Sequence, residues 1–385
     1  MTKVLITGGA GFIGSHTADA LIRSGYDVRV LDILDPQAHG NPPKPLAART
    51  FPKHLNPDVE CIKGDVRNLE TVVDALEGVD AVFHFASLTG VGQSMYDVRS
   101  YVDTNCTGTA TLLEALIKRR EKPLKRMVLA SSRAVYGEGS HVCTEHGVVF
   151  PGTRERKAME SGDLKVRCPY CQSPVTSIAT QENRKLNPLS IYGMTKLQQE
   201  QLCSQLAMHF QLPVTILRYF NVYGSRQSLK NPYTGVASIF YSRLNANQPL
   251  FLYEQGTPER DFVHVADVAR ANLLALSTDV DPGSCFNVGS GANSSIRSIA
   301  LSLAKATGRK ADIRETGDFR VGDIHSCFAD LTRSAESLNY KPEVSLEDGM
   351  MEFASWASGE ETKDLYSVSA DELRSHNLMG SADSP

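Results

Sequence analysis

The stretch Gly8-Gly9-Ala10-Gly11-Phe12-Ile13-Gly14 decides the fold, because it follows directly on the apolar run Val4–Thr7 and opens a helical pattern. Its glycines at 8, 11 and 14 are spaced three apart, as in turns that bind a dinucleotide between a strand and a helix. Gly8 permits the tight turn, Gly11 lets a pyrophosphate approach the backbone, and Gly14 lets the helix pack close to the sheet. The free N–H groups and positive end of the helix then attract the phosphates. The stretch predicts a dinucleotide site that also includes Phe12 and Ile13.

Short apolar runs alternate with helical patterns on either side of this turn. Such runs are typical of strands that are buried on both faces of a parallel sheet. The predicted strands are Val4–Thr7, Val28–Asp32, Glu60–Lys63, Ala81–Phe85 and Met127–Ser131, with a helix over Val98–Lys118. The alternation predicts right-handed β-α-β units in an α/β, Rossmann-type, doubly wound parallel sheet. We expect this dinucleotide-binding domain to span residues 1–220.

An acidic residue, Asp32, ends the second predicted strand. Its carboxylate can accept hydrogen bonds from both ribose hydroxyls and would repel a 2′-phosphate, which favours NAD over NADP. Arg29 lies three residues before Asp32 on the same strand, so its side chain points to the opposite face of the sheet. It is therefore a poor phosphate ligand.

The pattern changes at two places, within the first domain and beyond it. Residues 33–58 hold six of the 18 prolines and predict an irregular loop. From residue 221 to 357 short strands, such as Phe251–Tyr253 and Phe286–Val288, mix with helices, which predicts a smaller α+β substrate lobe with some exchange of chain between the two lobes. The remaining residues, 358–385, are polar, and we expect a mobile tail.

Composition limits the partners and the compartment. The chain has 385 residues, 40 of them Lys or Arg and 44 Asp or Glu, so its net charge of −4 argues against nucleic acid or an anionic membrane as the main partner. It contains no apolar run of the roughly 18 residues that a transmembrane helix needs. The first strand begins so close to Met1 that we expect no signal peptide. A cytoplasmic protein is the expectation, with its eight cysteines as thiols or metal ligands.

A cysteine-bearing insertion over residues 138–188 carries two short pairs of metal-ligand residues. These are Cys143-Thr144-Glu145-His146 and Cys168-Pro169-Tyr170-Cys171, separated by 21 residues. Three thiolates and one imidazole in this spacing predict a closed tetrahedral zinc site on Cys143, His146, Cys168 and Cys171. Such a metal would order a segment that has little apolar periodicity. A redox-active cysteine pair and unliganded thiols remain as alternatives.

Further motifs follow in a fixed order, and with them the chain resembles the extended short-chain dehydrogenase/reductase superfamily, in its nucleotide-sugar epimerase/dehydratase branch. The resemblance rests on the glycine turn and on Gly64-Asp65-Val66, His84-Phe85-Ala86, Asn105-Cys106-Thr107-Gly108-Thr109, Ser131–Gly137, Tyr192-Gly193-Met194-Thr195-Lys196, Arg218–Gly224, Arg260–Val265 and Arg320–Ile324. It implies NAD as cofactor. Besides the glycine turn and Asp32, it implies cofactor contacts from Asp65, Val66, Phe85, Ala86, Asn105 and Lys196.

The resemblance also implies the chemistry. Tyr192 and Lys196 are four apart on a helix and share a face, and a neighbouring ammonium would favour the phenolate that accepts a proton from a sugar hydroxyl. Ser132 is expected to bind the same hydroxyl. Dehydratases of the branch carry Asp-Glu after this serine, whereas Arg133-Ala134 stand here, which favours epimerisation at C4 through a 4-keto sugar. A net dehydratase or oxidoreductase, and a non-catalytic NAD-binding protein, are the alternatives.

The substrate implied by the resemblance is a nucleotide-diphosphate sugar. Asn221, Arg260 and Arg320 are expected at the diphosphate and Asp323 at the nucleotide ribose. Further substrate contacts are expected from Thr89, Gly92, Gln93 and Ser94 at the sugar and from Tyr233 at the nucleotide. Together with the insertion, these segments are similar to those of dTDP-L-rhamnose 4-epimerases, which implies a dTDP-6-deoxyhexose such as dTDP-L-rhamnose. UDP- and GDP-hexoses remain alternatives.

The superfamily resemblance implies a homodimer. The helices over Val98–Lys118 and Tyr192–His209 would pair with their symmetry copies in a four-helix bundle. We expect such an interface to bury Leu112, Leu113 and Leu116, which also pack on the sheet.

Overall fold

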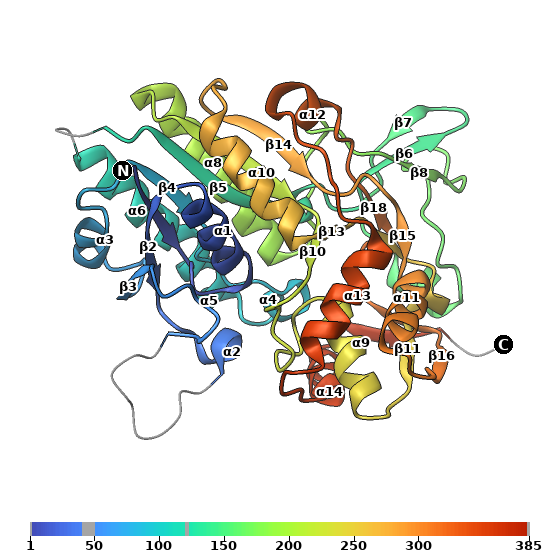
Figure 1. The fold of residues 1–385 in the computed structure, drawn as a ribbon. Helices are drawn as coiled ribbons and strands as arrows, with labels where there is room; N and C mark the ends of the chain where they lie inside the picture. The colour runs from blue at the N-terminus through green and yellow to red at the C-terminus, as the bar shows by residue number, and fades with distance from the viewer. Residues whose placement is uncertain (1, 41–50, 120–122, 383–385) are drawn as a thin grey trace.

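A seven-stranded sheet forms the centre of the computed structural model, which describes residues 2–40, 51–119 and 123–382 (Figure 1). Its strands lie in the order β14-β9-β5-β4-β1-β2-β3, and all neighbouring pairs are parallel. Their bounds are β1 (Lys3–Thr7), β2 (Asp27–Asp32), β3 (Glu60–Lys63), β4 (Ala81–His84), β5 (Arg126–Ser132), β9 (Val214–Tyr219) and β14 (Ser284–Val288). The predicted Rossmann-type α/β fold is confirmed. Strands β2 and β3 are added on one side of β1, and β4 and the later strands on its other side. Ligands bind at the carboxyl ends of the strands where the strand order reverses in this way.

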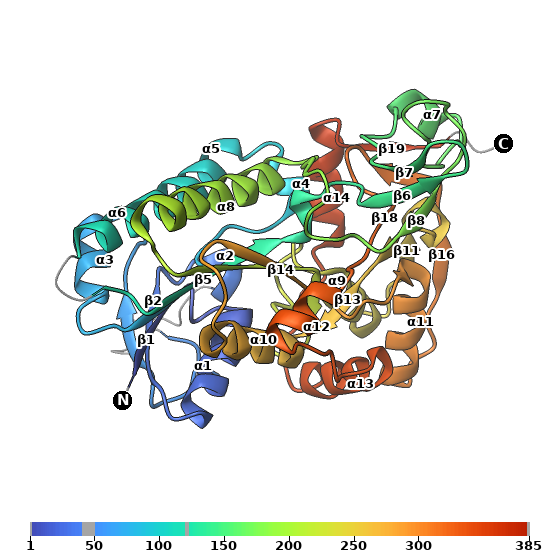
Figure 2. The ribbon, with the colours of Figure 1, turned by 90° about the horizontal axis from the view of Figure 1, so that it is seen from above.

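Helices cover both faces of the sheet (Figure 2). Alternate side chains of each strand point to opposite faces, so Ile6 packs with one set of helices and its neighbour Leu5 with the other. The first set is α1 (Phe12–Arg23) and α10 (Val265–Ser277). The second set is α3 (Leu69–Ala75), α6 (Gly108–Lys118) and α8 (Ile191–Phe210).

The second helical layer corrects one expectation about the dimer. Leu112, Leu113 and Leu116 of α6 are buried within this chain, where they pack with the strands and with α3 and α8. They therefore have no surface left to give to a partner. The large apolar side chains exposed on the stretches 98–118 and 191–210 are different ones, namely Val98, Val102, Ile117, Met194, Met208 and Phe210.

The predicted helix over Val98–Lys118 contains a wide turn. It starts as α5 (Val98–Tyr101), continues as a π-helical turn (Val102–Thr107) and ends as α6. The π-helical turn carries Asn105, which is fully buried and bonds to the loop that follows β4. Such turns often occur near functional sites.

A smaller lobe packs beside the carboxyl edge of the sheet around a core of its own. Its helices are α9 (Val236–Asn245), α11 (Ile296–Thr307) and α13 (Leu346–Ala357), and its short strands include β11 (Leu250–Leu252) and β16 (Ile313–Glu315). One expectation was wrong, because Phe286–Val288 belongs to β14 and pairs with β9 in the main sheet. The chain thus returns to the first domain with α10 and β14, and the domain boundaries stay a prediction.

Short elements connect the two lobes. They are β10 (Asn221–Tyr223), a 3-10 turn (Tyr253–Gly256), β12 (Glu259–Arg260), β13 (Phe262–His264), β15 (Ser294–Ser295), β17 (Asp318–Arg320), β18 (Ser326–Cys327) and α12 (Thr332–Leu338). A second 3-10 turn, Arg133–Val135, follows β5.

The insertion forms a small three-stranded sheet with the strand order β7-β6-β8 and one short helix. Its elements are β6 (Ser140–Cys143), β7 (Gly147–Val149), α7 (Arg156–Glu160) and β8 (Thr176–Ile178). The hydrophobic cluster inside it is made largely of cysteines, with Val149 and Val175 beside Cys143, Cys168 and Cys171.

The C-terminal segment does not form the mobile tail that its polar composition predicts. It folds into α14 (Tyr366–Ser375) and β19 (Met379–Ser381), and β19 pairs antiparallel with β17. Ala370, Leu373 and Met379 anchor it because they are buried against tyrosines of other segments. A few apolar residues at helical spacing suffice for this contact, and the average composition hides them.

The predicted irregular loop over residues 33–58 contains one helical turn, α2 (Pro36–His39). Three of the prolines on which this prediction rests, Pro42, Pro43 and Pro45, lie outside the described residues. Two further helical turns, α4 (Val91–Ser94) and α5, follow β4. Within the described part of the chain, no helix has both the length and the apolar character to cross a bilayer.

Candidate active site

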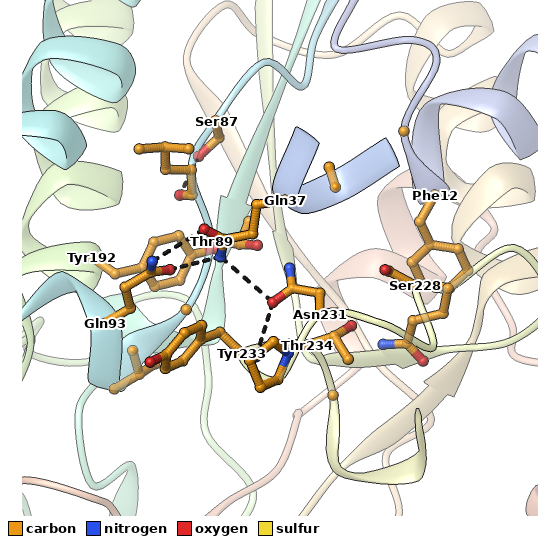
Figure 3. A pocket seen from close by; sticks show the side chains of 18 of the residues that line it. Phe12, Gln37, Ser87, Thr89, Gln93, Tyr192, Ser228, Asn231, Tyr233 and Thr234 are labelled. Carbon is orange, nitrogen blue, oxygen red and sulfur yellow. Dashed lines mark hydrogen bonds between the residues drawn. The ribbon is translucent and has the colours of Figure 1, made fainter. Parts of the chain in front are cut away.

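A cavity of about 1650 Å³ runs from the glycine turn along the carboxyl ends of the strands to the smaller lobe. Its lining includes nearly all the residues predicted to bind a cofactor or a substrate. Figure 3 shows Tyr192 and Gln93 on one side of this space, with Asn231 and Tyr233 from the smaller lobe facing them. This is the crevice where open α/β sheets bind their ligands.

The glycine turn fits a pyrophosphate. Gly8 has φ of +70°, and a Cβ at this position would lie 2.7 Å from the backbone nitrogen of Ala86. A Cβ at Gly14 would lie 2.6 Å from the carbonyl oxygen of Gly8, so neither position accepts a side chain. Gly11 lies at the N-terminus of α1 and lines the cavity with Phe12 and Ile13. The first N–H groups of α1 have no intrahelical partner and are available to an anion there.

Asp32 lies at the end of β2 beside this turn. Its Oδ2 accepts a hydrogen bond from the backbone nitrogen of Ala10 at 3.0 Å, and its Oδ1 accepts one from that of Leu34 at 2.8 Å. The carboxylate is therefore held in place at the cavity wall. Arg29 is occupied elsewhere, because it donates to two backbone carbonyls and pairs with Glu60 at 2.8 Å. Only a negative charge is thus presented to the ribose by β2.

Other predicted cofactor residues line the same half of the cavity. They are Asp65, Val66, Phe85, Ala86 and Lys196. Asp65 also pairs with Arg67 at 2.6 Å, which lowers the pKa of the carboxyl group through the hydrogen bonds from that arginine.

Asn105 was expected among the cofactor contacts, and the structure places it behind the cavity wall. Its Oδ1 accepts from the backbone nitrogen of Leu88, and its Nδ2 donates to the carbonyl oxygen of Leu88 and to Oγ1 of Thr195. The side chain is fully buried and joins the loop after β4 to α8. Its contacts are with the chain itself because the π-helical turn directs it inward.

Tyr192 and Lys196 line the cavity, and Ser132, which was expected beside them, lies just behind its lining and reaches it through Tyr192. Ser190 caps α8 by accepting a hydrogen bond from the backbone nitrogen of Gly193. This places Tyr192, in the first turn of the helix, at the cavity. Lys196 lies one turn later, 5.9 Å from the centroid of the Tyr192 ring, and donates to the carbonyl oxygen of Ala130 at 3.0 Å. Ser132 ends β5 and hydrogen-bonds Tyr192.

The charges around the phenol differ from the expectation. Burial raises the pKa of Tyr192, and the hydrogen bond with Ser132 and the positive charge of Arg133 oppose that rise. Burial also lowers the pKa of Lys196 from 10.5 to about 7. In this structure Arg133, which lines the cavity, is therefore the cation that favours the phenolate.

Most of the residues predicted to bind the substrate line the cavity, and most of them are polar. The predicted substrate residues that line it are Thr89, Gly92, Gln93, Asn221, Tyr233, Arg260, Arg320 and Asp323. Two of them have buried polar atoms without a partner in the described chain, namely Oδ1 of Asn221 and Nε of Arg320. Unpaired buried groups of this kind are costly unless a ligand satisfies them.

Two predicted substrate residues have other contacts. Ser94 is buried outside the cavity lining, where its Oγ accepts a hydrogen bond from the backbone nitrogen of Tyr192 at 3.0 Å. It positions the start of α8 and does not face the sugar. Arg260 uses both terminal nitrogens on the chain, including a 2.9 Å bond to Asp323 and a 2.7 Å bond to the carbonyl oxygen of Ile324. Its hydrogen bonds hold the segment that carries Asp323.

Sequence reasoning named Gln93 but missed Gln37, its partner in a contact that bridges the cavity. Gln37 of α2 exchanges hydrogen bonds with Gln93, at 2.8 and 3.1 Å, and reaches Oδ1 of Asn231 at 3.5 Å (Figure 3). Gln37 lies in the proline-rich loop and Asn231 in the smaller lobe, 194 residues apart. The chain carries no local signal for such a contact.

The four predicted metal ligands come together in the insertion. Sγ of Cys143 lies 3.6 Å from Sγ of Cys171 and 3.7 Å from Nδ1 of His146, and Sγ of Cys168 lies 3.6 Å from the same nitrogen. All four ligand atoms lie within 4.8 Å of one another. Tetrahedral zinc, with bonds of about 2.3 Å to sulfur and about 2.0 Å to nitrogen, separates its ligand atoms by roughly 3.5–3.8 Å. The cluster thus has the dimensions of a closed zinc site.

The chain is similar to known proteins over most of its length. The model of the NAD dependent epimerase/dehydratase family matches residues 4–155 and 167–289. A dTDP-L-rhamnose 4-epimerase of Burkholderia thailandensis is 34% identical over 93% of this chain and 95% of its own length. A putative UDP-glucose 4-epimerase of Methanocaldococcus jannaschii is 31% identical over 92% and 97%.

Solved structures give the same result. UDP-glucose 4-epimerase of Thermotoga maritima, in a crystal structure with UDP-glucose, superimposes with a TM-score of 0.74 at 28% identity, over 93% of this chain and 99% of that one. UDP-glucuronic acid 4-epimerase of Bacillus cereus, solved with UDP-glucuronic acid and NAD, has a TM-score of 0.73 at 29% identity, again over 93% and 99%.

The lowered pKa of Lys196 generates a stability prediction. The unfolded chain keeps the Lys196 proton up to about pH 10, whereas the folded chain without dinucleotide releases it near pH 7, so the unfolded state binds more protons between these values and stability rises with pH there. We expect Lys196→Met to raise the melting temperature of dinucleotide-free protein near pH 7 and to lose this advantage towards pH 10. Lys185→Met, at an exposed position, is the control. Melting curves that show no pH-dependent difference between Lys196→Met and the native chain would contradict the burial argument.

Proposed function

The chain belongs to the NAD dependent epimerase/dehydratase family, and from this premise we propose that it is an NAD-dependent nucleotide-sugar 4-epimerase. The observation that carries the proposal is that Tyr192, hydrogen-bonded to Ser132, and Lys196 line one cavity with a glycine turn that fits a dinucleotide. The first residues of α1, Asp32 and Lys196 would hold NAD. When bound, NAD supplies the hydride acceptor and returns the hydride.

Tyr192 is the proposed general base. Its phenolate oxygen accepts the proton of the C4 hydroxyl as the C4 hydrogen leaves as hydride, and the sugar becomes a 4-keto sugar. Ser132 donates a hydrogen bond to the Tyr192 oxygen, and the positive charge of Arg133 favours the negative charge on the phenolate. In the return step Tyr192 gives the proton back to the C4 oxygen. Atoms and electrons balance over the cycle, so no net oxidant is needed.

Epimerisation fits this site better than dehydration. Elimination of water across C5–C6 needs an acid and a base beside the catalytic serine, and Arg133 and Ala134 provide neither at neutral pH. A 4-keto sugar must instead turn so that its other face meets the hydride. The cavity of about 1650 Å³ leaves room for that rotation.

For the substrate we propose a dTDP-6-deoxyhexose such as dTDP-L-rhamnose. The support is the dTDP-L-rhamnose 4-epimerase of Burkholderia thailandensis, which is similar over nearly its whole length, together with the cysteine-bearing insertion. Arg320 and Asn221 have unpaired buried atoms for a diphosphate or sugar hydroxyls. UDP-sugar epimerases are also similar to this chain, so a UDP-hexose is the competing substrate.

We also infer that NAD is preferred over NADP. The support is the carboxylate of Asp32, held at the cavity wall by two backbone N–H groups, without a cation from β2 to balance a 2′-phosphate. For the compartment we propose the cytoplasm, because Cys106, Cys203 and Cys327 are buried as thiols and not as disulfides, as is usual in reducing compartments.

A structural zinc ion on Cys143, His146, Cys168 and Cys171 is the next part of the proposal. The ligand spacing supports it, and so does the lack of another core in the insertion. A closed site with four protein ligands leaves no position for a substrate, so the ion would act by ordering the segment. That segment reaches the cavity through Arg154, which donates to the carbonyl oxygen of Asp323 at 3.2 Å and to Glu254 at 3.0 Å.

We further propose a homodimer in which α5, the following π-helical turn and α8 face their symmetry copies. The support is the exposed apolar surface on these neighbouring helices, where Val98, Val102 and Met194 have exposed fractions of 42%, 41% and 56%. A two-fold interface would bury each of them twice.

The first prediction tests the reaction. Incubation with dTDP-, UDP- and GDP-hexoses, followed by NMR, should show inversion at C4 without stoichiometric NADH, with a dTDP-6-deoxyhexose as the preferred substrate. Tyr192→Phe should reduce turnover by ~10²–10⁴-fold, because the general base is lost, while NAD binding stays near normal. Loss of water from the sugar, or net NADH release, would show a dehydratase or an oxidoreductase instead.

The second prediction concerns the metal. Protein purified without chelator should contain about one zinc ion per chain, with sulfur ligands near ~2.3 Å by X-ray absorption. The double variant Cys168→Ser/Cys171→Ser should lose zinc and weaken either substrate affinity or stability, while NAD binding persists because the glycine turn is in another part of the fold. Cys61→Ser, outside the cluster, is the control. Native protein that contains no zinc would refute the site.

The third prediction concerns assembly. Light scattering at micromolar concentration should give the mass of a dimer for the native chain. Val102→Lys with Met194→Lys should shift the equilibrium to monomer, because two ammonium groups per chain would be placed in the interface. Met351→Lys, at a side chain 50% exposed on α13, should leave the dimer intact. A native chain that is monomeric throughout would rule out this interface.

A further inference from the structure

The C-terminal segment, residues 359–382, folds back over the substrate half of the cavity, although it lies outside the part of the chain that the family model matches. Leu365, Tyr366, Ser369, Leu373 and Leu378 of this segment line the cavity. Figure 2 shows α14 beside α4, two helices that are more than 250 residues apart in the sequence. The segment is therefore part of the wall that a substrate meets.

We propose that α14 is a specificity-determining wall of the nucleotide-sugar site, in which Leu373 holds α4 and Glu372 clasps Tyr96 to Tyr233. The inference rests on the proposed function for the identity of the ligand. It adds a binding role for a segment that composition alone assigns to a tail.

Leu373 provides the apolar contact. It is 3% exposed and packs so closely on α4 that a Cβ at Gly92 would lie 3.0 Å from its Cδ2. Gly92 and its neighbour Gln93 line the cavity as well, so Leu373 fixes the part of the wall that is nearest to the catalytic helix. α4 in turn contacts α8, where Ser94 bonds to the backbone of Tyr192.

Glu372 provides the polar contact. Tyr96 donates to the Tyr233 hydroxyl at 2.7 Å, and the Tyr233 hydroxyl donates to Oε2 of Glu372, which also lies 3.0 Å from the Tyr96 oxygen. The Tyr96 ring stacks on His376, with ring centroids 4.4 Å apart and planes 11° apart. Three distant segments are thereby joined around Tyr233, a residue of the cavity wall.

The end of the segment also positions Arg320. β19 pairs with β17 so that Met379 lies opposite Arg320, and the backbone nitrogen of Val321 donates to the carbonyl oxygen of Leu378 at 3.0 Å. The Arg320 guanidinium lies 5.3 Å from the centroid of the Tyr253 ring, whose hydroxyl is 2.7 Å from that of Tyr366 in α14. Arg320, which has an unpaired buried nitrogen on the substrate side, is thus held by this segment.

The dinucleotide half of the cavity is built without this segment. The glycine turn and Asp32 belong to β1, α1 and β2, and their contacts are with β4 and the neighbouring loops. Damage to the α14 wall should therefore appear in the affinity for the nucleotide sugar, while NAD binding and the chemical step persist.

The test compares Leu373→Ala with Val368→Ala, which truncates an exposed side chain on the same helix. We expect Leu373→Ala to raise KM for the preferred nucleotide sugar by about tenfold or more, the effect of a lost apolar contact in a binding pocket. kcat and the NAD affinity from fluorescence titration should stay within about twofold. Val368→Ala should match the native enzyme in all three quantities.

Glu372 gives a second, independent readout that survives if Leu373→Ala fails to fold. Glu372→Ala should raise KM in the same direction, and Glu372→Gln, which keeps an acceptor oxygen for Tyr233, should restore most of the affinity. Asp371→Ala, at the neighbouring exposed carboxylate that pairs with Arg374, is the control. Folded Leu373 and Glu372 variants with a native KM would overturn the proposal. A native enzyme that turns over no nucleotide sugar would instead refute the proposed function.

Discussion

The catalytic geometry depends on a buried ion pair between Arg218 of β9 and Glu200 of α8. Nη2 of Arg218 lies 2.7 Å from Oε2 of Glu200 and its Nε lies 2.8 Å from Oε1, with both side chains at most 6% exposed. Glu200 also accepts a hydrogen bond from Ser131, the residue before Ser132. One carboxylate thereby ties α8, which carries Tyr192 and Lys196, to the end of β5. Loss of either partner would leave a buried charge unpaired, which costs about 3–5 kcal/mol.

The same network extends to the edge of the sheet. Nη1 of Arg218 donates to the Tyr136 hydroxyl and to the carbonyl oxygen of Glu182, both at 2.9 Å. Tyr136 bonds Asn287 of β14 at 2.6 Å. The chain enters the insertion, residues 138–188, just after Tyr136, and Glu182 lies near the end of the insertion. One arginine, Arg218, therefore contacts both ends of it. An insertion anchored in this way can vary in length without moving Ser132 relative to Tyr192.

Most of the central sheet was predictable because its strands are buried on both faces. Such strands consist mainly of apolar residues, and the predicted Ala81–Phe85 matches the fully buried β4 (Ala81–His84) to within one residue. Two helices of the smaller lobe, Ile296–Thr307 and Leu346–Ala357, were predictable for a different reason. Their apolar residues recur at the spacing of a helix with one buried face. α14 was not predictable, because only Ser369, Ala370 and Leu373 of its ten residues are buried and the contact is with a distant part of the chain.

The candidate site divides in the same way. Residues whose role follows from a local pattern, such as Gly8, Asp32 and Tyr192, lie at the cavity as predicted. Roles that depend on which partner a side chain finds could not be predicted. Asn105 and Ser94 have polar side chains that could contact a ligand. Both instead hydrogen-bond to the backbone of neighbouring segments.

The cavity thus has two walls of different origin. The wall with the glycine turn lies within residues 4–155, which match the family model, whereas α7 and the C-terminal segment lie outside the matched ranges. These two segments contact each other, because Arg156 of α7 donates to the carbonyl oxygen of Asn377 at 3.0 Å. The preceding Arg154 reaches the carbonyl oxygen of Asp323 on the substrate side. Family motifs can therefore identify the cofactor and the chemistry, while we propose that recognition of the sugar depends on contacts that the insertion and the C-terminal segment add.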